Sequence, residues 1–226
     1  MMTGWFDVIA VLWFLTIWVG YTLVAKRRAK TVSCLSFELR RKRNDWMQQM
    51  LCRENKMADV GLLSTLERNV SFFASSSLLV LAGLLTALAS ADKISVVLSN
   101  VLPWSRDAEV SLQLKLLCIA LIYVFAFFQF TWSLRQYGFG GVLIGAAPDG
   151  RKMEDADREA YAIRAAKVID QAGHSFNYGL RSMYFSLAAL AWFIDPLLFM
   201  AATVIVMLVM KQREFHSKVL HALRDC

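Results

Sequence analysis

Long, uninterrupted apolar runs constrain this chain more than any other feature. Three of them, Trp5–Ala25, Ser71–Ala91 and Leu112–Leu134, reach the length of about 20 residues that a helix needs to cross a hydrocarbon core. Backbone amides inside a bilayer find no water, so a crossing segment must pair its own N–H and C=O groups as a helix. The sequence therefore predicts three membrane-spanning helices from these runs.

The composition excludes several other classes of protein. Hydrophobic residues make up 57% of the chain and charged residues 19%, whereas a soluble domain averages about 45–50% and about 25%. Three prolines and eleven glycines in 226 residues exclude collagen-like and low-complexity chains. We expect an all-α integral membrane protein, a single domain over residues 1–226, with about five transmembrane helices and additional cytoplasmic amphipathic helices.

The last apolar region, residues 177–210, has two interpretations. It is either one kinked helix or a helical hairpin, with arms Asn177–Ile194 and Pro196–Met210. Asp195 followed by Pro196 favours the hairpin, because Asp is a good N-cap and Pro is preferred at the first helical position. The hairpin gives five spans and the kinked helix gives four.

Charge favours five spans, because basic residues accumulate in the cytoplasmic segments of membrane proteins. Residues 26–70 carry eleven basic side chains and residues 211–226 carry four, whereas residues 92–111 carry two. Five spans place residues 26–70, 135–176 and 211–226 in the cytoplasm and residues 92–111 outside. The N-terminus is then outside and the C-terminus inside, whereas four spans would put the basic C-terminal segment outside.

Residues Leu35–Cys52 show the apolar spacing of an amphipathic helix and carry a basic block. Such a helix can lie on an anionic leaflet, for lipid sensing or for docking a partner, or it can be a plain connector at the surface. The residues predicted to contact the lipid surface are Arg40, Arg41, Lys42, Arg43 and Trp46.

Two more segments are predicted on the cytoplasmic side. Glu154–Ala172 is expected to form a separate helix, with acidic residues in its first turn and a face of small residues. The glycine-rich stretch Tyr137–Pro148 lacks the GK[ST] sequence of a phosphate-binding loop. We expect it to form a re-entrant or interfacial turn.

Polar residues within the predicted spans are the best candidates for function, because a charge at the membrane centre costs about 2.5–3.5 kcal/mol. Arg181 is predicted about one turn inside the fourth span, where it lines a polar path or extends to the headgroups. The other polar residues line the same path or form interhelical hydrogen bonds. The candidate path residues are Gln129, Ser133, Gln136, Asn177 and Arg181.

Several segments together resemble one family of membrane proteins. They are Arg68-Asn69, Phe72–Ser75, Phe127–Gln136, Ile144–Pro148, Phe176–Arg181, Trp192-Phe193 and Arg213–Phe215. In these stretches the chain resembles the "domain of unknown function 599" (DUF599) membrane proteins, which are found in bacteria and plants. The resemblance implies a multi-span membrane protein, here expected in the bacterial cytoplasmic (inner) membrane, and supplies no reaction, ligand or partner.

No catalytic or metal-binding motif is present, and His216 and His221 miss the i, i+4 spacing of a helical metal pair. We therefore expect no enzyme activity, no cofactor, no metal and no nucleic-acid partner. The expected partners are membrane lipids and further copies of the chain. The first functional hypothesis is a homo-oligomeric channel-like or transport protein for a small ion or solute, and the alternative is a membrane scaffold or accessory subunit without a transport path.

Overall fold

The computed structural model describes residues 2–28, 34–101 and 109–224, and these residues form helices joined by short turns, without a strand. This confirms the all-α class. In chain order the elements are α1 (Met2–Arg28), α2 (Leu35–Cys52), α3 (Met57–Ala89), α4 (Ala91–Val101), α5 (Glu109–Gly145), η1 (Gly150–Lys152), α6 (Asp155–Leu190), η2 (Ala191–Phe193), α7 (Pro196–Phe215) and α8 (Lys218–Arg224).

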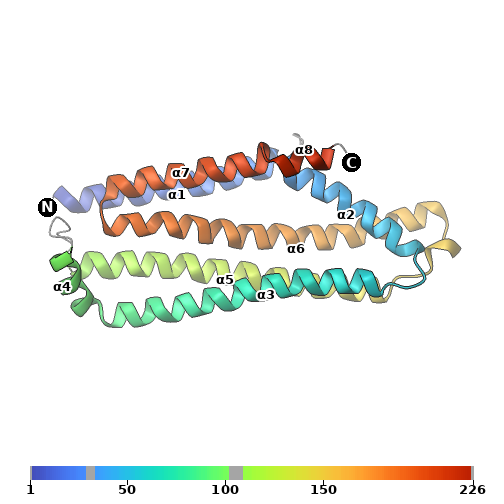
Figure 1. Ribbon diagram of the computed structural model, residues 1–226, viewed down its shortest axis with the longest axis horizontal. Helices are drawn as coiled ribbons and strands as arrows, with labels where there is room; N and C mark the ends of the chain where they lie inside the picture. Colours follow the sequence, from blue (N-terminus) through green and yellow to red (C-terminus); the bar gives the residue numbers. More distant parts are fainter. Residues whose placement is uncertain (1, 29–33, 102–108, 225–226) are drawn as a thin grey trace.

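The helices form one elongated bundle (Figure 1). The three longest, α3, α5 and α6, run the length of the bundle, and the α5–α6 and α3–α5 contacts are the most extensive. Helix α7 packs along the second half of α6, α1 packs mainly on α7 and reaches α6 through ring contacts, and α2 crosses the first half of α6 obliquely. The helices that pack on α6 therefore change near its middle. There α1 and α7 end and α2 begins.

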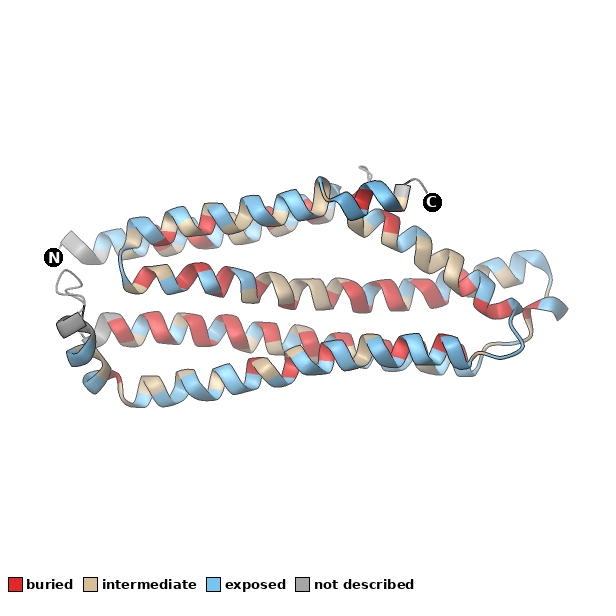
Figure 2. Cartoon of the chain, in the orientation of Figure 1, coloured by how far each residue is buried: buried red, intermediate tan, exposed pale blue. Residues whose placement is uncertain are grey.

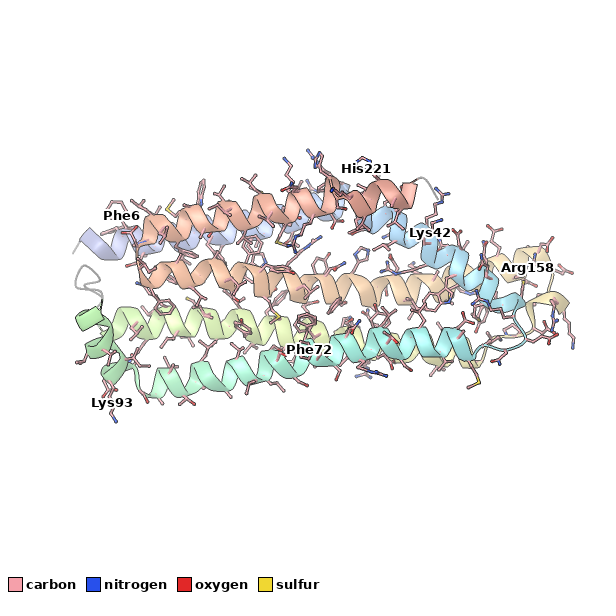
Figure 3. The ribbon with its side chains drawn as sticks, viewed as in Figure 1. Phe6, Lys42, Phe72, Lys93, Arg158 and His221 are labelled. Carbon is pink, nitrogen blue, oxygen red and sulfur yellow. The ribbon has the colours of Figure 1, made fainter. Side chains whose placement is uncertain are left out.

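Four helical segments are long and apolar enough to cross a membrane: Trp5–Ala25, Met57–Ala89, Leu112–Gly145 and Pro196–Leu223. Large apolar side chains on their outer faces are exposed, such as Phe72 and Leu79, while buried positions face the inside of the bundle (Figure 2). Figure 3 labels Phe6 and Lys93 at one end of the bundle and Arg158 at the opposite end. The chain is a membrane protein.

The region predicted as a kinked helix or a hairpin is a hairpin. Helix α6 ends at Leu190, a short 3-10 turn follows, and α7 starts at Pro196 and runs back along α6. The carboxylate of Asp195 accepts hydrogen bonds from the backbone N–H groups of Leu197 (2.7 Å) and Leu198 (3.3 Å). Asp195 therefore caps α7 as its sequence position predicts, and the alternative of one kinked helix is wrong.

The predicted turn at Tyr137–Pro148 is wrong, because α5 continues to Gly145. A Cβ atom on Gly140 would lie 3.1 Å from Cγ1 of Ile169 on α6, and one on Gly141 would lie 3.3 Å from Cδ2 of Leu63 on α3. These glycines bring three helices close together, and the packing outweighs their low helix propensity. With 37 residues α5 is about 55 Å long, so it extends well beyond a hydrocarbon core of about 30 Å.

The boundary predicted between Glu154–Ala172 and Asn177–Ile194 is also wrong, because both belong to the continuous helix α6. Gly173, which lies between the two predicted segments, is a close-packing position: a Cβ atom there would lie 2.8 Å from Nη2 of Arg43. Helix α3 similarly begins at Met57, well before the predicted Ser71. Helix α2 has the predicted bounds, Leu35–Cys52, and the apolar segment Trp5–Ala25 within α1 matches the first predicted span. The cytoplasmic position of α2 remains a prediction, as does the outer position of residues 92–111, which contain most of α4.

Aromatic rings fill the contact between α1, α6 and α7. We call Phe14, Phe185, Trp192 and Phe199 the aromatic layer. Phe14 lies 5.1 Å from Phe199 and 5.8 Å from Phe185 between ring centroids, and Trp192 stacks on Phe199 at 5.2 Å. All four side chains are buried. Offset and edge-to-face rings at these separations attract each other beyond the effect of their burial.

Candidate functional site: a polar cleft beside α6

A cleft of about 510 Å³ lies beside the middle of α6, where the helices that pack on α6 change. Its walls come from the end of α1, the first half of α2, one residue of α5 and the middle of α6. The described lining includes three permanent cations, Arg40, Lys167 and Arg181, and a single carboxylate, Asp170. The remaining lining is mostly neutral and polar, so this polar cleft carries a net positive charge.

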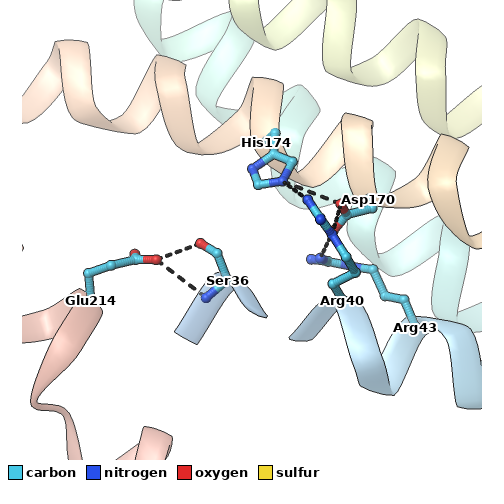
Figure 4. A network of polar contacts seen from close by, with 6 residues as sticks. All are labelled: Ser36, Arg40, Arg43, Asp170, His174 and Glu214. Carbon is cyan, nitrogen blue, oxygen red and sulfur yellow. Dashed lines mark hydrogen bonds and ion pairs between the residues drawn. The ribbon is translucent and has the colours of Figure 1, made fainter. Parts of the chain in front are cut away.

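Two arginines of α2 converge on Asp170 of α6 (Figure 4). Arg40 Nε donates to Asp170 Oδ2 at 2.9 Å, and Arg43 Nη1 donates to Asp170 Oδ1 at 2.7 Å. The Asp170 side chain is only 6% exposed. Because each carboxylate oxygen has its own guanidinium partner, these charge-assisted bonds fix both the position and the rotation of α2 on α6.

His174 lies one turn beyond Asp170 and completes what we call the arginine cluster (Arg40, Arg43, Asp170, His174). Its Nε2 atom is 3.3 Å from Asp170 Oδ2 and 3.2 Å from Arg40 Nη2. A ring nitrogen that bears hydrogen donates to the carboxylate, and one with a free lone pair accepts from the guanidinium. The single nitrogen makes one of these two bonds at a time, depending on the tautomer of the ring.

Burial and charge act in opposite directions on Asp170. Burial is the largest single influence and alone would raise the pKa of this carboxyl. The hydrogen bond and charge of His174, together with the charges of Arg43 and Arg40, outweigh burial and hold the pKa of Asp170 below its usual value. The cluster therefore keeps Asp170 ionised.

A second carboxylate, Glu214 near the end of α7, binds the start of α2 (Figure 4). Its Oε1 accepts hydrogen bonds from Ser36 Oγ (2.5 Å) and from the Ser36 backbone N–H (3.3 Å). A carboxylate at this place satisfies a free N–H of the first helical turn and complements the positive end of the helix dipole. Glu214 therefore joins α7 to α2 at the edge of the cleft.

Arg181 occupies the part of the cleft closest to the apolar half of the bundle. Its guanidinium carbon lies 5.4 Å from the ring centre of Tyr21 and 5.9 Å from that of Tyr178. Its Nη2 is 3.8 Å from Glu214 Oε2, which is beyond hydrogen-bond distance. The side chain is 11% exposed. Arg181 thus lies between two rings and a nearby carboxylate, lines the cleft, and makes no hydrogen bond to another described residue.

The structure gathers three of the five predicted path residues. Gln136, Asn177 and Arg181 line the polar cleft. Ser133 is buried between helices, where its Oγ donates to the Ala172 carbonyl at 2.7 Å. Gln136 also accepts a hydrogen bond from Ser175 Oγ at 3.0 Å, and Gln129 is half-buried outside the cleft.

The residues predicted to contact lipid have several different environments. Arg40 and Arg43 bind Asp170 as described, and Trp46 Nε1 donates to the buried Asp59 of α3 at 2.7 Å. Arg41 is exposed and lies 4.0 Å from Glu38, and Lys42 is half-buried. Contact of these residues with a lipid surface remains a prediction.

Sequence analysis missed Asp170 and Glu214. The i, i+4 spacing of Asp170 and His174 is a signal that a pairing search on α6 could have used. Glu214 carries no such signal, because its partner Ser36 is far away in the sequence. In the part of the chain that the structure describes, no three His, Cys, Asp or Glu side chains group closely enough to hold a metal ion.

Fold and cleft together define an all-helical membrane protein with a cationic cleft at the junction of two helix packings. The chain belongs to the family described as "Protein of unknown function, DUF599", whose family model matches residues 9–219. This confirms the resemblance seen in the sequence. The comparisons with curated proteins and with solved structures found no match.

Proposed function

We propose that this protein is a homo-oligomeric, channel-like or transport protein for a small solute, and that the solute is an anion. The observation that carries the proposal is the charge of the polar cleft, whose lining holds the cations Arg40, Lys167 and Arg181 and the carboxylate Asp170, with Glu214 at its edge. Asp170 is already neutralised by Arg40 and Arg43. The remaining positive charge, in a recess with low-dielectric walls, raises the local concentration of anions.

The proposed topology has five spans: the four apolar helical segments described above and the second half of α6, which is the fourth span in chain order. On α6, exposed side chains before Arg181 are mostly polar, such as Arg164 and Gln171, whereas Tyr184, Leu187 and Leu190 are exposed after it. This change of exposed chemistry supports a membrane boundary close to Arg181. The polar cleft would then open at the cytoplasmic boundary, with the N-terminus outside and the C-terminus inside the bacterial inner membrane.

We propose self-association because polar side chains inside one bundle, such as Ser133 and Gln136, already make hydrogen bonds within that bundle. Ser133 and Gln136 make hydrogen bonds to α6, so they hold helices together and leave few polar groups free in the bundle interior. A hydrated path across the hydrocarbon would therefore run between copies. Light scattering of the detergent-solubilised protein measures the mass, and a monomeric particle would contradict this part of the proposal.

Flux of small anions into liposomes that contain the purified protein tests the function. Lys167→Glu reverses an exposed charge of the cleft, and we expect it to lower anion flux several-fold without affecting folding. Arg164→Glu is the matched control, because Arg164 is exposed on the same helix outside the cleft lining. Equal flux through both variants, or no flux of any ion through folded protein, would refute the proposal.

The alternative, a scaffold or accessory subunit without a path, is favoured by one observation. Beyond the predicted end of the third span, α5 exposes the apolar side chains of Phe139 (47%) and Val142 (69%). Exposed apolar side chains outside a membrane suit a protein partner. Crosslinking in native membranes followed by mass spectrometry tests this alternative, and recovery of self-crosslinks alone would count against it.

A further inference from the structure

An apolar groove adjoins the polar cleft. It has a volume of about 240 Å³ and is lined by α1 residues including Trp18, Val19 and Thr22, by Phe125 of α5, and by Tyr178 and Arg181 of α6. Its α1 wall belongs to the apolar segment Trp5–Ala25. Tyr178 and Arg181 line the groove and the cleft alike. The two recesses therefore meet at these two side chains, with the apolar groove on one side and the cationic cleft on the other.

Arg181 lies at the junction of these recesses, and its N–H groups are available to donate hydrogen bonds. Among the described residues, its contacts are two aromatic rings and Glu214 Oε2 at 3.8 Å, and none of them is a hydrogen bond. Glu214 directs its other oxygen, Oε1, to Ser36. A guanidinium presents five N–H donors in a planar fork that matches two oxygens of a phosphate. Arg181 is thus positioned to bind such a group.

We propose that this junction binds one anionic phospholipid of the adjacent leaflet, with its phosphate on Arg181 and one acyl chain in the apolar groove. Lys167 and Arg40 supply further positive charge on the cleft side. In a leaflet whose boundary lies near Arg181, the apolar groove would lie at the depth of the acyl chains. The cationic cleft would lie at the depth of the headgroups. The inference rests on the proposed five-span topology and does not require flux.

The charge requirement is tested by lipid retention in native mass spectrometry of the detergent-solubilised protein. We expect phosphatidylglycerol to bind in preference to phosphatidylcholine, and Arg181→Gln to weaken phosphatidylglycerol binding about ten-fold, because charge-assisted hydrogen bonds are lost. Lys167→Gln is a second variant at an exposed position and should weaken binding less. Arg135→Gln is the control, since Arg135 is exposed on α5 away from both recesses.

The groove is tested by a matched pair of substitutions on α1. Val19→Trp fills the groove, whereas Val8→Trp places the same ring on a residue outside the groove lining, and each valine is 53% exposed. We expect Val19→Trp to lower phosphatidylglycerol retention several-fold and Val8→Trp to leave it unchanged. Equal retention by both variants, or no preference for phosphatidylglycerol, would overturn the proposal.

Soluble glycerophosphoglycerol, the headgroup without chains, separates a lipid from a free anion. The proposal expects it to compete weakly, because it lacks the acyl chain. Full competition that Val19→Trp does not alter would identify a site for soluble anions and overturn the lipid assignment. Selective lipid binding without anion flux would leave this inference intact and refute only the transport proposal, so the two failures are distinguishable.

Discussion

In the aromatic layer α6 meets α1 and α7 through rings, whereas in the arginine cluster it meets α2 through charges. Phe185 packs edge-to-face on Phe14, and Trp192 stacks on Phe199 while its Nε1 donates to Asp7 at the outer edge of the layer. Asp170, fewer than five turns from Phe185 on α6, binds Arg40 and Arg43. Inside a bilayer, helix association relies on packing and hydrogen bonds, because lipid tails are as apolar as the side chains.

One continuous helix is thus matched to two environments by packing on different partner helices along its length. Near the cluster, α6 is lined with small residues such as Ala165 and Ala166, so α2 and α5 approach closely and charges can pair at their edges. In the aromatic layer, large rings separate the helices and fill the space. The cleft lies between these two regions of α6.

The largest effect is expected from breaking the aromatic layer. Phe199→Ala removes a side chain that is 1% exposed and contacts Phe14 and Trp192, so we expect a loss of about 3 kcal/mol in unfolding free energy. Unfolding in mixed micelles, followed by circular dichroism, measures it. Leu197→Ala, at a 64% exposed position on the same helix, should have little effect. Similar losses in both variants would show that the layer does not stabilise the hairpin.

Breaking the arginine cluster is expected to cost somewhat less. Asp170→Ala leaves Arg40 and Arg43 unpaired, and we expect a loss of about 2 kcal/mol, reduced from the value for a buried pair because Arg40 is 45% exposed. The same unfolding measurement applies, with the exposed Asp157→Ala as control. Added salt should diminish the loss in this cluster and leave the Phe199→Ala loss unchanged. A salt-independent Asp170→Ala effect would contradict the ion-pair assignment.

The pH dependence of stability also distinguishes the arginine cluster from the aromatic layer. The folded-state pKa of Asp170 is lowered, so its contribution is fully present above the ordinary value of 3.8 and is lost as the pH falls through the lowered value. The difference in melting temperature between the wild-type protein and Asp170→Asn should therefore persist at neutral pH and shrink in strong acid. Phe199→Ala should show no such change. A constant difference for Asp170→Asn across the acid range would be incompatible with the lowered pKa.

The smallest effect is expected at Ser133. Ser133→Ala removes the hydrogen bond to the Ala172 carbonyl, and interhelical bonds of this kind contribute about 0.6 kcal/mol in a membrane protein. Thr131→Ala is the control, because Thr131 donates to its own helix. Unfolding experiments with several replicates can resolve this difference. A loss above that of Asp170→Ala would mean that Ser133 has a larger role than joining α5 to α6.

Much of the fold could be predicted from local sequence. The apolar run Trp5–Ala25 matches a membrane-crossing segment, and Asp195-Pro196 marks the turn of the hairpin, because capping and helix initiation are local effects. Gly140 contributed to the wrong prediction of a turn at Tyr137–Pro148. Its function is to allow close packing against Ile169 on another helix. Tertiary packing of this kind leaves no local signal.

The candidate site could be predicted only in part. Arg181 was identified because an ionisable residue within an apolar run is unusual. Arg40 and Arg43 were identified as basic, but their partner Asp170 lies 130 and 127 residues away along the chain, and a single sequence does not reveal such pairs. Glu214 and Ser36 were missed for the same reason, since they are 178 residues apart.

The continuity of α6 from Asp155 to Leu190 has a mechanical consequence. A straight helix without proline resists bending, so it behaves as a stiff rod about 54 Å long. Arg40 and Arg43 bind this helix near its middle. The rings of α1 and α7 pack against its second half. The continuous helix therefore holds the arginine cluster near its middle and the α6–α7 turn at its end at a fixed distance and rotation from each other.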